Sequence, residues 1–209
     1  MKNIKQEVPM VVVKRLPRYY RYLNDLAEHN INRISSAELS KRMGVTASQI
    51  RQDFNCFGDF GQQGYGYNVK HLQEKIGEIL GLNKQYALII VGAGNLGHAL
   101  ANYAGIEKRG YRIIGIFDND PNKIGTKIKN ISVSDISTLE SFCSEHKVDI
   151  AVLSIPKPVV KEITERLINS GVKGLWNFSY AELKTPDDIV VENVHLSDSL
   201  MTLSYKITE

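Results

Sequence analysis

The sequence predicts an α/β fold in two parts, a small helical part followed by a doubly wound parallel sheet. Amphipathic helical segments and one glycine-rich segment fill residues 1–84, while from Tyr86 onward apolar strand-like segments alternate with helical ones. Such alternation is typical of a parallel sheet with helices on both faces. The charge changes at the same place, because residues 1–84 hold 13 Lys and Arg against 8 Asp and Glu, whereas residues 85–209 hold 13 against 15.

The composition is that of a globular chain. Of the 209 residues, 43% are hydrophobic and 23% charged, and no apolar run reaches the roughly 18 residues that a membrane span requires. The N-terminal residues lack the apolar core and cleavage site of a signal peptide, so we expect a cytoplasmic protein. Cys56 and Cys143 form no CxxC motif and the five histidines show no metal-ligand spacing, so we expect neither a disulfide nor a metal site.

Two helices are predicted at the start of the first part. Residues 16–28 place leucines and tyrosines at helical spacing, with a proline tolerated in the first turn. Ser35 and Glu38 form a capping box that opens a short second helix. Gly44 ends that helix in a left-handed conformation.

A third helix is predicted after Thr46, which has the spacing of a second capping box with Gln49. Ile50 and Phe54 lie on one face of it and leave the other face free. Residues 58–69 then interleave glycines with aromatic residues, which favours a twisted hairpin. A further amphipathic helix follows and closes the first part near residue 83.

Two short helices that meet at a glycine turn, followed by a hairpin, outline a winged helix-turn-helix. The third helix would enter the major groove of DNA, and the hairpin would approach the DNA backbone or minor groove. Arg15 and Arg18 would add nonspecific attraction to phosphates. A small helical protein-interaction domain is the alternative, and the positive charge also fits a solvated face. The residues that we assign to DNA binding are Lys41, Arg42, Ser48, Gln49, Arg51, Gln52, Gly64, Tyr65 and Tyr67.

The second part consists of alternating strands and helices. Strands are predicted at 86–92, 111–118, 148–156, 174–179 and 188–196, and helices at 95–110, 137–147, 158–171 and 197–207. We divide the chain into a DNA-binding domain, a sheet domain and a terminal helix, at residues 1–84, 85–192 and 193–209.

A glycine-rich turn, GxGxxG, lies directly between the first strand and the first helix of this part. Gly92 permits the tight turn, Gly94 permits close approach of a pyrophosphate, and Gly97 permits close packing of helix on strand. The phosphates would bind at the helix N-terminus. The turn therefore predicts a Rossmann-type dinucleotide site.

Asp118 ends the second strand, 21 residues after Gly97. An acidic residue at this distance accepts hydrogen bonds from the adenosine ribose and favours NAD over NADP. The alternative is that Asp118 only caps a turn. The third strand ends at the same sheet edge, where the ligand crevice of such folds lies. From the residues alone we assign to the dinucleotide Gly92, Ala93, Gly94, Asn95, Leu96, Gly97, Asp118, Asn119, Ser154, Ile155 and Pro156.

Together, the two signatures resemble the Rex family, bacterial redox-sensing transcriptional repressors. The resemblance extends over nearly the whole chain and is carried by residues 49–69, 91–100, 116–125 and 173–178. It implies a winged-helix domain, a Rossmann domain that senses NADH and NAD⁺, and a C-terminal helix exchanged across a homodimer. It also implies that the homodimer binds a palindromic operator and leaves it when NADH binds.

By position, the resemblance places Tyr103 near the nicotinamide and gives Arg21, on the first helix, a part in the switch. Some members have an Asp where this chain has His195, and that Asp exchanges partners between an Arg and a Tyr. An imidazole cannot relay charge as a carboxylate does, so His195 is either a packed or solvated residue or a pH-sensitive hydrogen-bonding group.

Two further departures concern DNA binding. The family often has two basic residues where this chain has Arg51 and Gln52, and a basic residue in the hairpin where it has Gln62 and Gln63. We therefore expect fewer phosphate contacts or a slightly different operator.

A dehydrogenase is the alternative to a sensor. It requires a second domain for its substrate and an acid or base beside the nicotinamide, yet only about 35 residues follow Gly174. We therefore expect a non-enzymatic sensor, and keep as the alternative a small NAD-dependent dehydrogenase or other Rossmann enzyme fused to a helical interaction domain.

Overall fold

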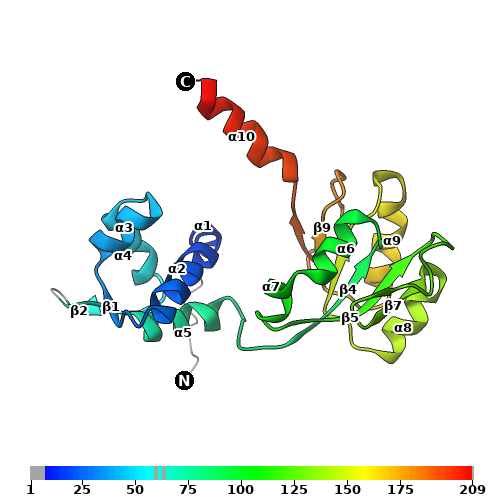
Figure 1. Ribbon diagram of the computed structural model, residues 1–209, viewed down its shortest axis with the longest axis horizontal. Helices are drawn as coiled ribbons and strands as arrows, with labels where there is room; N and C mark the ends of the chain where they lie inside the picture. The colour runs from blue at the N-terminus through cyan, green and yellow to red at the C-terminus, as the bar shows by residue number, and fades with distance from the viewer. Residues whose placement is uncertain (1–7, 59–60, 63–64, 209) are drawn as a thin grey trace. The chain divides into compact units, whose positions relative to one another are not determined.

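The computed structural model describes residues 8–58, 61–62 and 65–208, and the chain divides into two units, Met1–Asn83 and Lys84–Glu209 (Figure 1). Each unit has its own buried core. The predicted fold class is confirmed, since a helical unit with a small hairpin precedes a Rossmann-type sheet.

The first unit packs its helices and a small antiparallel sheet around one apolar core. The sheet has the order β1 (Arg33–Ile34), β3 (Gly66–Asn68), β2 (Gly61–Gln62), so the predicted hairpin is present. The short α1 and β1 are not predicted from the sequence, because neither is long enough to show a period. The helices are α1 (Met10–Val13), α2 (Leu16–Glu28), α3 (Ser36–Met43), α4 (Ala47–Asn55) and α5 (Val69–Ile79).

Helix caps fix the helix-turn-helix. The predicted capping box at Ser35 is confirmed: its hydroxyl accepts from the Glu38 N–H at 3.1 Å, and the Glu38 carboxylate accepts from the Ser35 N–H at 2.9 Å. Gly44 ends α3 with φ of 64°, which favours glycine. Thr46 caps α4 by accepting from the Gln49 N–H, but the prediction of a second capping box is wrong, because the Gln49 amide donates to another side chain of α4.

The second unit contains a seven-stranded sheet among its described residues, and all its pairings are parallel except that of β6 with β7. The chain winds outward from β4 in one direction and then returns to wind in the other. β6 and β7 are not predicted from the sequence, because they are short and separated by a tight turn. The sheet order is β10 (Val190–Asn193), β9 (Gly174–Asn177), β8 (Ile150–Leu153), β4 (Tyr86–Val91), β5 (Tyr111–Asp118), β7 (Ile131–Asp135) and β6 (Lys127–Ile128).

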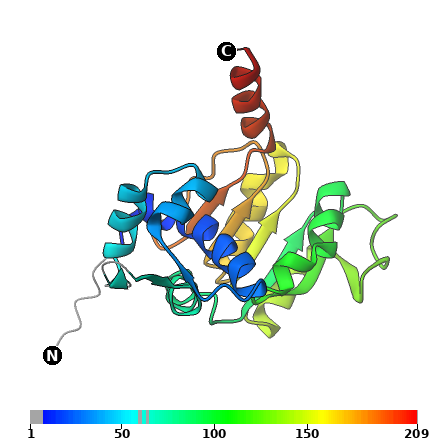
Figure 2. The same ribbon diagram turned by 60° about the vertical axis from the view of Figure 1, so that its left-hand side comes forward.

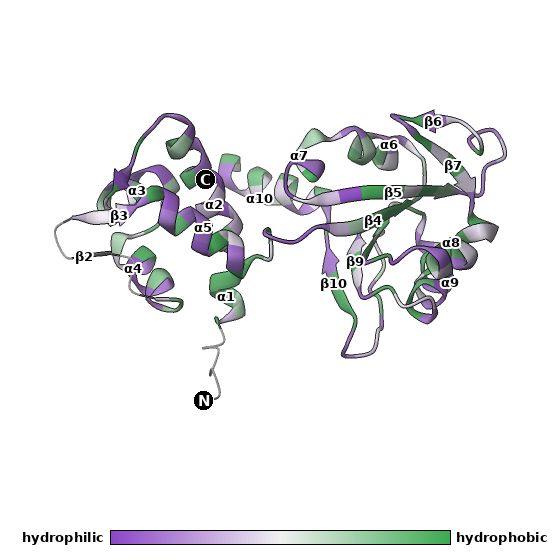
Figure 3. Cartoon of the chain, turned by 90° about the horizontal axis from the view of Figure 1, so that it is seen from below, coloured by the Kyte–Doolittle hydropathy of each residue, from purple (hydrophilic) through white to green (hydrophobic). Residues whose placement is uncertain are grey.

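Helices cover both faces of this sheet. Helices α8 (Leu139–Glu145) and α9 (Lys157–Asn169) pack on one face, and α6 (Asn95–Asn102) and α7 (Ala104–Glu107) on the other. The central strands β4 and β5 carry the hydrophobic residues that both layers cover (Figure 3). The single helix predicted over 95–110 is in fact two, because Tyr103 adopts an extended conformation between them.

The predicted terminal helix is present as α10 (Leu196–Thr208), after a short connection from β10 (Figures 1 and 2). None of its described side chains is buried. Its large apolar side chains are between 54% and 76% exposed.

Candidate nucleotide site and DNA-binding face

The carboxyl ends of β4 and β8 lie side by side, since Val91 pairs with Leu153. The chain leaves β4 to β5 on one side and reaches β8 on the other, so this is the switch point of the sheet, where ligands bind in such folds. Two turns meet there, Gly92–Gly97 after β4 and Ser154–Pro156 after β8.

The three glycines of the first turn have different physical roles. Gly92 has φ of 103°, and a Cβ there would lie 2.5 Å from the Ser154 carbonyl oxygen. A Cβ on Gly97 would collide with the Gly92 carbonyl oxygen, so this glycine lets α6 pack closely on the turn. A Cβ on Gly94 would meet no atom within 4 Å. The protein itself therefore gives no steric reason for glycine at 94, and the predicted close approach of a pyrophosphate would supply one.

The N-terminus of α6 is open toward this turn. Gly94 is its N-cap residue, and no side chain caps the first turn of the helix. The N–H groups at residues 95–97 have no intrahelical partner, so they and the helix dipole favour an anion here.

A cavity of about 500 Å³ lies at the switch point. Seven of the assigned dinucleotide residues line it: Gly92, Gly94, Asp118, Asn119, Ser154, Ile155 and Pro156. The other lining residues are Val91, Lys123, Ile136, Val159, Glu162, Ile163 and Arg166. Lys123 and Arg166 were missed, because nothing in the sequence pattern separates them from other surface cations.

Asp118 is 7% exposed and holds the glycine turn in place. Its carboxylate accepts hydrogen bonds from the N–H of Ala93 at 2.7 Å and of Asp120 at 2.9 Å, and from Lys123 Nζ at 3.2 Å. Burial alone would raise its pKa, but these hydrogen bonds hold the pKa below its usual range. Asp118 is therefore an ionised turn cap that also faces the cavity, and its contact with an adenosine ribose stays a prediction.

Arg166, on α9, forms another fixed charge in the cavity wall. Its guanidinium donates to the Ile136 carbonyl at 2.8 Å and forms a two-point ion pair with Glu140. The hydrogen bond from Arg166 lowers the pKa of Glu140 to about 2. The pair joins α9 to α8 beside the cavity.

The residues assigned to the switch do not meet in this cavity. Tyr103 is 59% exposed and lines a separate cavity of about 460 Å³ near the amino ends of the strands. His195 is half-buried, with its ring centroid 5.6 Å from that of Tyr180. Arg21 is exposed on α2, in the other unit.

The helix-turn-helix presents most of the residues assigned to DNA. The exposed members are Lys41, Arg42, Ser48, Arg51, Gln52 and Tyr65. The Arg51 guanidinium donates to the Ser36 hydroxyl at 3.1 Å, and that of Arg33 donates to the Tyr65 carbonyl at 3.1 Å. Gly64 lies outside the described residues.

Three residues that the sequence analysis assigned to DNA binding need correction. Tyr67 is 9% exposed and packs edge-on against Phe54, with ring centroids 5.0 Å apart, so it belongs to the core and not to a DNA-facing surface. Gln49 is half-buried, and its amide donates to Asp53 at 2.9 Å. Arg15 is paired with the same carboxylate and is therefore not a free phosphate-attracting cation.

Within the part of the chain that the structure describes, no group of His, Cys, Asp and Glu could hold a metal ion. Over the same residues, no helix is both long and apolar enough to span a membrane.

Comparison with known proteins gives two family models and many relatives. Residues 83–181 match the model described as CoA binding domain, and residues 7–55 match that of a putative DNA-binding protein N-terminus. A protein of Caldicellulosiruptor saccharolyticus named redox-sensing transcriptional repressor Rex is 56% identical to this chain, and the alignment covers 98% of this chain and 94% of the relative. A protein of the same name from Clostridium tetani is 52% identical, and that alignment covers 98% of this chain and 97% of the relative.

Solved structures of a Rex-family repressor also match this chain. RSP, a Rex-family repressor, in complex with NAD⁺ and operator DNA, has a TM-score of 0.91 and 54% identity over 96% of this chain and 93% of that one. RSP in complex with NADH has a TM-score of 0.90 and 51% identity over 99% and 95%. The chain belongs to the Rex family of redox-sensing transcriptional repressors.

Proposed function

We propose that this chain is a repressor that binds operator DNA as a homodimer and leaves the DNA when NADH binds. Expression of its target genes would then follow the NADH/NAD⁺ ratio in the cytoplasm. One observation carries the proposal: the same chain holds a dinucleotide-type cavity at the switch point of its sheet and an exposed basic helix-turn-helix. RSP, solved with NAD⁺ on operator DNA and with NADH, supports it.

The residues of the cavity fit a dinucleotide. The pyrophosphate would bind at the N-terminus of α6, where Gly94 leaves space beside the backbone. The ionised Asp118 would accept from the adenosine ribose hydroxyls and repel a 2′-phosphate, which favours NAD(H) over NADP(H). The turn at 154–156 would face the nicotinamide half of the ligand.

The reading face would be the exposed side of α4. Arg51 is suited to a bidentate contact with a guanine edge, and Ser48 and Gln52 to bases or phosphates. Lys41 and Arg42, in the last turn of α3, would attract the phosphate backbone.

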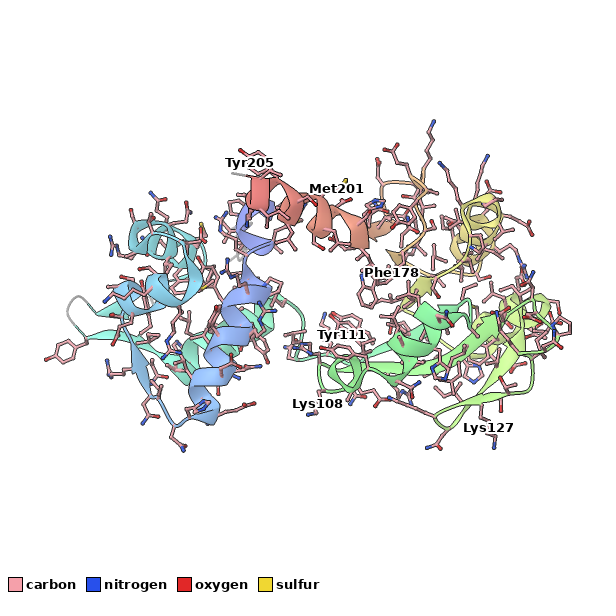
Figure 4. All side chains as sticks on the ribbon, turned by 45° about the horizontal axis from the view of Figure 1, so that its top comes forward. Lys108, Tyr111, Lys127, Phe178, Met201 and Tyr205 are labelled. Atoms are coloured by element: carbon pink, nitrogen blue, oxygen red, sulfur yellow. The ribbon has the colours of Figure 1, made fainter. Side chains whose placement is uncertain are left out.

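A second copy of the chain would cover α10. Its exposed apolar side chains include Met201 and Tyr205, 62% and 65% exposed (Figure 4). A helix with such a face is stable only against another surface, which supports exchange of residues 193–209 across a homodimer. A two-fold homodimer would in turn require a palindromic operator.

NADH and NAD⁺ differ by a positive charge on the nicotinamide ring and by the shape of that ring. A ligand shifts a protein between two arrangements only by its differential affinity for them. A difference of about 1–3 kcal/mol changes operator affinity roughly 5- to 150-fold, which is enough for a switch. NADH would favour an arrangement in which the two α4 helices no longer match successive major grooves, about 34 Å apart.

The test is a titration of NADH and of NAD⁺ into the protein on DNA, followed by anisotropy of a labelled duplex and by the absorbance of reduced nicotinamide. A duplex selected by the protein from a randomised library serves as the operator. Release by NADH without loss of its absorbance is expected. Steady oxidation of NADH, or equal effects of the two nucleotides, would contradict the proposal.

A further inference from the structure

A buried carboxylate joins the DNA-reading helix α4 to α2. Asp53 is 1% exposed and accepts four hydrogen bonds. Arg15 donates two of them, from Nε to Oδ2 at 2.7 Å and from Nη2 to Oδ1 at 2.6 Å. The Tyr19 hydroxyl donates to Oδ2 at 2.8 Å, and the Gln49 amide to Oδ1 at 2.9 Å.

Three of these hydrogen bonds connect different helices. Arg15 is the N-cap residue of α2 and Tyr19 lies in the first turns of that helix, whereas Asp53 lies on α4. The guanidinium fork meets the carboxylate at two points, which fixes both the direction and the position of the pair.

The apolar contacts between the same helices are less directional. Tyr19 and Phe54 pack edge to face with ring centroids 4.9 Å apart, and Phe54 packs in the same manner on Tyr67 of β3. Hydrophobic burial depends on area more than on direction, so such contacts fix the relative rotation of two helices less strictly than a two-point ion pair does. Only the carboxylate of this ion pair is fully buried, since the Arg15 side chain is 30% exposed. Such a pair stabilises a fold little relative to an apolar pair of similar size, and its contribution here is therefore sought in geometry.

The position of α4 on α2 determines where the DNA-reading side chains of α4 lie. At 3.6 residues per turn, Ser48 and Arg51 lie on the side of α4 roughly opposite Asp53, and Gln52 lies about a quarter turn from it. All three side chains are exposed. Any rotation of α4 about its axis therefore displaces all three side chains together.

We propose that Asp53 and Arg15 are positioning residues for sequence recognition: their pair sets the rotation and the axial position of α4 on α2, and thereby aims the reading face. Gln49 completes the same cluster and does not read bases. The inference rests on the proposed function and goes beyond it, because it assigns operator specificity to a pair that touches no DNA.

The first test compares Asp53→Asn and Arg15→Lys with wild type in the full-length protein. Binding is measured on the duplex that wild type selects from a randomised library and on a scrambled duplex, at the same salt concentration. The preference for the selected duplex should fall about tenfold or more, comparable to the loss of one base-pair contact. NADH affinity should not change, because the nucleotide cavity lies in the other unit.

The second test separates positioning from stability. In the triple variant Arg15→Met, Tyr19→Phe, Asp53→Leu, the polar groups that join α2 to α4 become apolar, whereas the half-buried Gln49 remains. The thermal midpoint should be close to that of wild type. The preference for the selected duplex should nevertheless stay low. Arg18→Met is the matched control, since Arg18 is an exposed arginine on the same helix, and its loss should weaken binding to both duplexes alike.

Wild-type preference in a folded triple variant would overturn the inference, because the pair would then serve stability alone. If the triple variant does not fold, Arg15→Lys decides, since it keeps the charge and removes the fork. Wild-type preference in Arg15→Lys would likewise overturn the inference. If wild type itself shows no preference for any duplex, the proposed function is wrong, and the positioning role that rests on it is wrong as well.

Discussion

Replacing Gly94 by alanine should separate ligand binding from folding. Gly94 has φ of −74° and ψ of −171°, which alanine adopts without strain, and its added Cβ would meet no protein atom within 4 Å. Alanine lowers the entropy of the unfolded chain but is a poorer N-cap residue than glycine, so the two effects offset each other and Gly94→Ala should change stability by less than about 1 kcal/mol.

The same methyl group would stand where the pyrophosphate approaches the backbone. Loss of one charge-assisted hydrogen bond costs about 1.5–3 kcal/mol, so NADH affinity should fall roughly 10- to 150-fold. Gly97→Ala is the contrasting variant, because its Cβ would collide with the Gly92 carbonyl oxygen. It should lose stability and ligand affinity together.

The assay is calorimetric titration of NADH beside chemical unfolding of each variant. Gly94→Ala should unfold at a denaturant concentration close to that of wild type and release operator DNA only at higher NADH concentrations. Wild-type NADH affinity in Gly94→Ala would refute the placement of the pyrophosphate. A large loss of stability in that variant would refute the claim that position 94 is sterically free.

Three other predictions follow from the structure. Hydrogen bonding from Arg166 holds the pKa of Glu140 at about 2, below the unfolded value of about 4.3, so the stability it contributes is present above about pH 4 and lost as pH falls toward 2. Glu140→Gln should therefore unfold slightly more easily than wild type at neutral pH, by less than about 1 kcal/mol since the pair is partly exposed, and denaturant curves should show this difference shrinking in acid. Arg51→Ala should cost about 1–3 kcal/mol on the selected duplex and relax selection at one base pair, whereas equal losses on scrambled DNA would mean a phosphate contact only. Removal of residues 196–208 should give monomers in sedimentation experiments, and a dimer that survives would exclude α10 from the interface.

Local signals in the sequence were sufficient to predict those elements whose ends are set by helix caps or by a glycine turn. Ser35, Glu38 and Gly44 define α3 by caps that require only neighbouring residues, and the glycine turn at 92–97 follows a strand and opens a helix as predicted. The two short strands at 127–128 and 131–135 carry no such signal, and the pairing of residues 131–135 with β5 depends on long-range contacts.

Contacts between residues far apart in the sequence determined the features that were not predicted. Tyr67 alternates with glycines in a polar hairpin, yet its ring is buried in the core of the first unit, where it packs on Phe54. Arg15 and Asp53 are 38 residues apart, and each alone has the pattern of a solvated charge. No local pattern indicates that they form an ion pair, so Arg15 was assigned to phosphates and Asp53 was not singled out.

The central claim is that nucleotide occupancy of one unit changes how far apart the two reading helices of the homodimer lie. Spin labels on Glu28→Cys, an exposed position at the end of α2 outside the residues assigned to DNA, would report the separation of the two DNA-binding units by pulsed electron resonance. The background would carry Cys56→Ser and retain the buried Cys143. NADH should shift the distance distribution between subunits, and NAD⁺ should leave it near that of the DNA-bound form. Superposable distributions with both nucleotides, in a protein that still leaves DNA when NADH binds, would contradict the account.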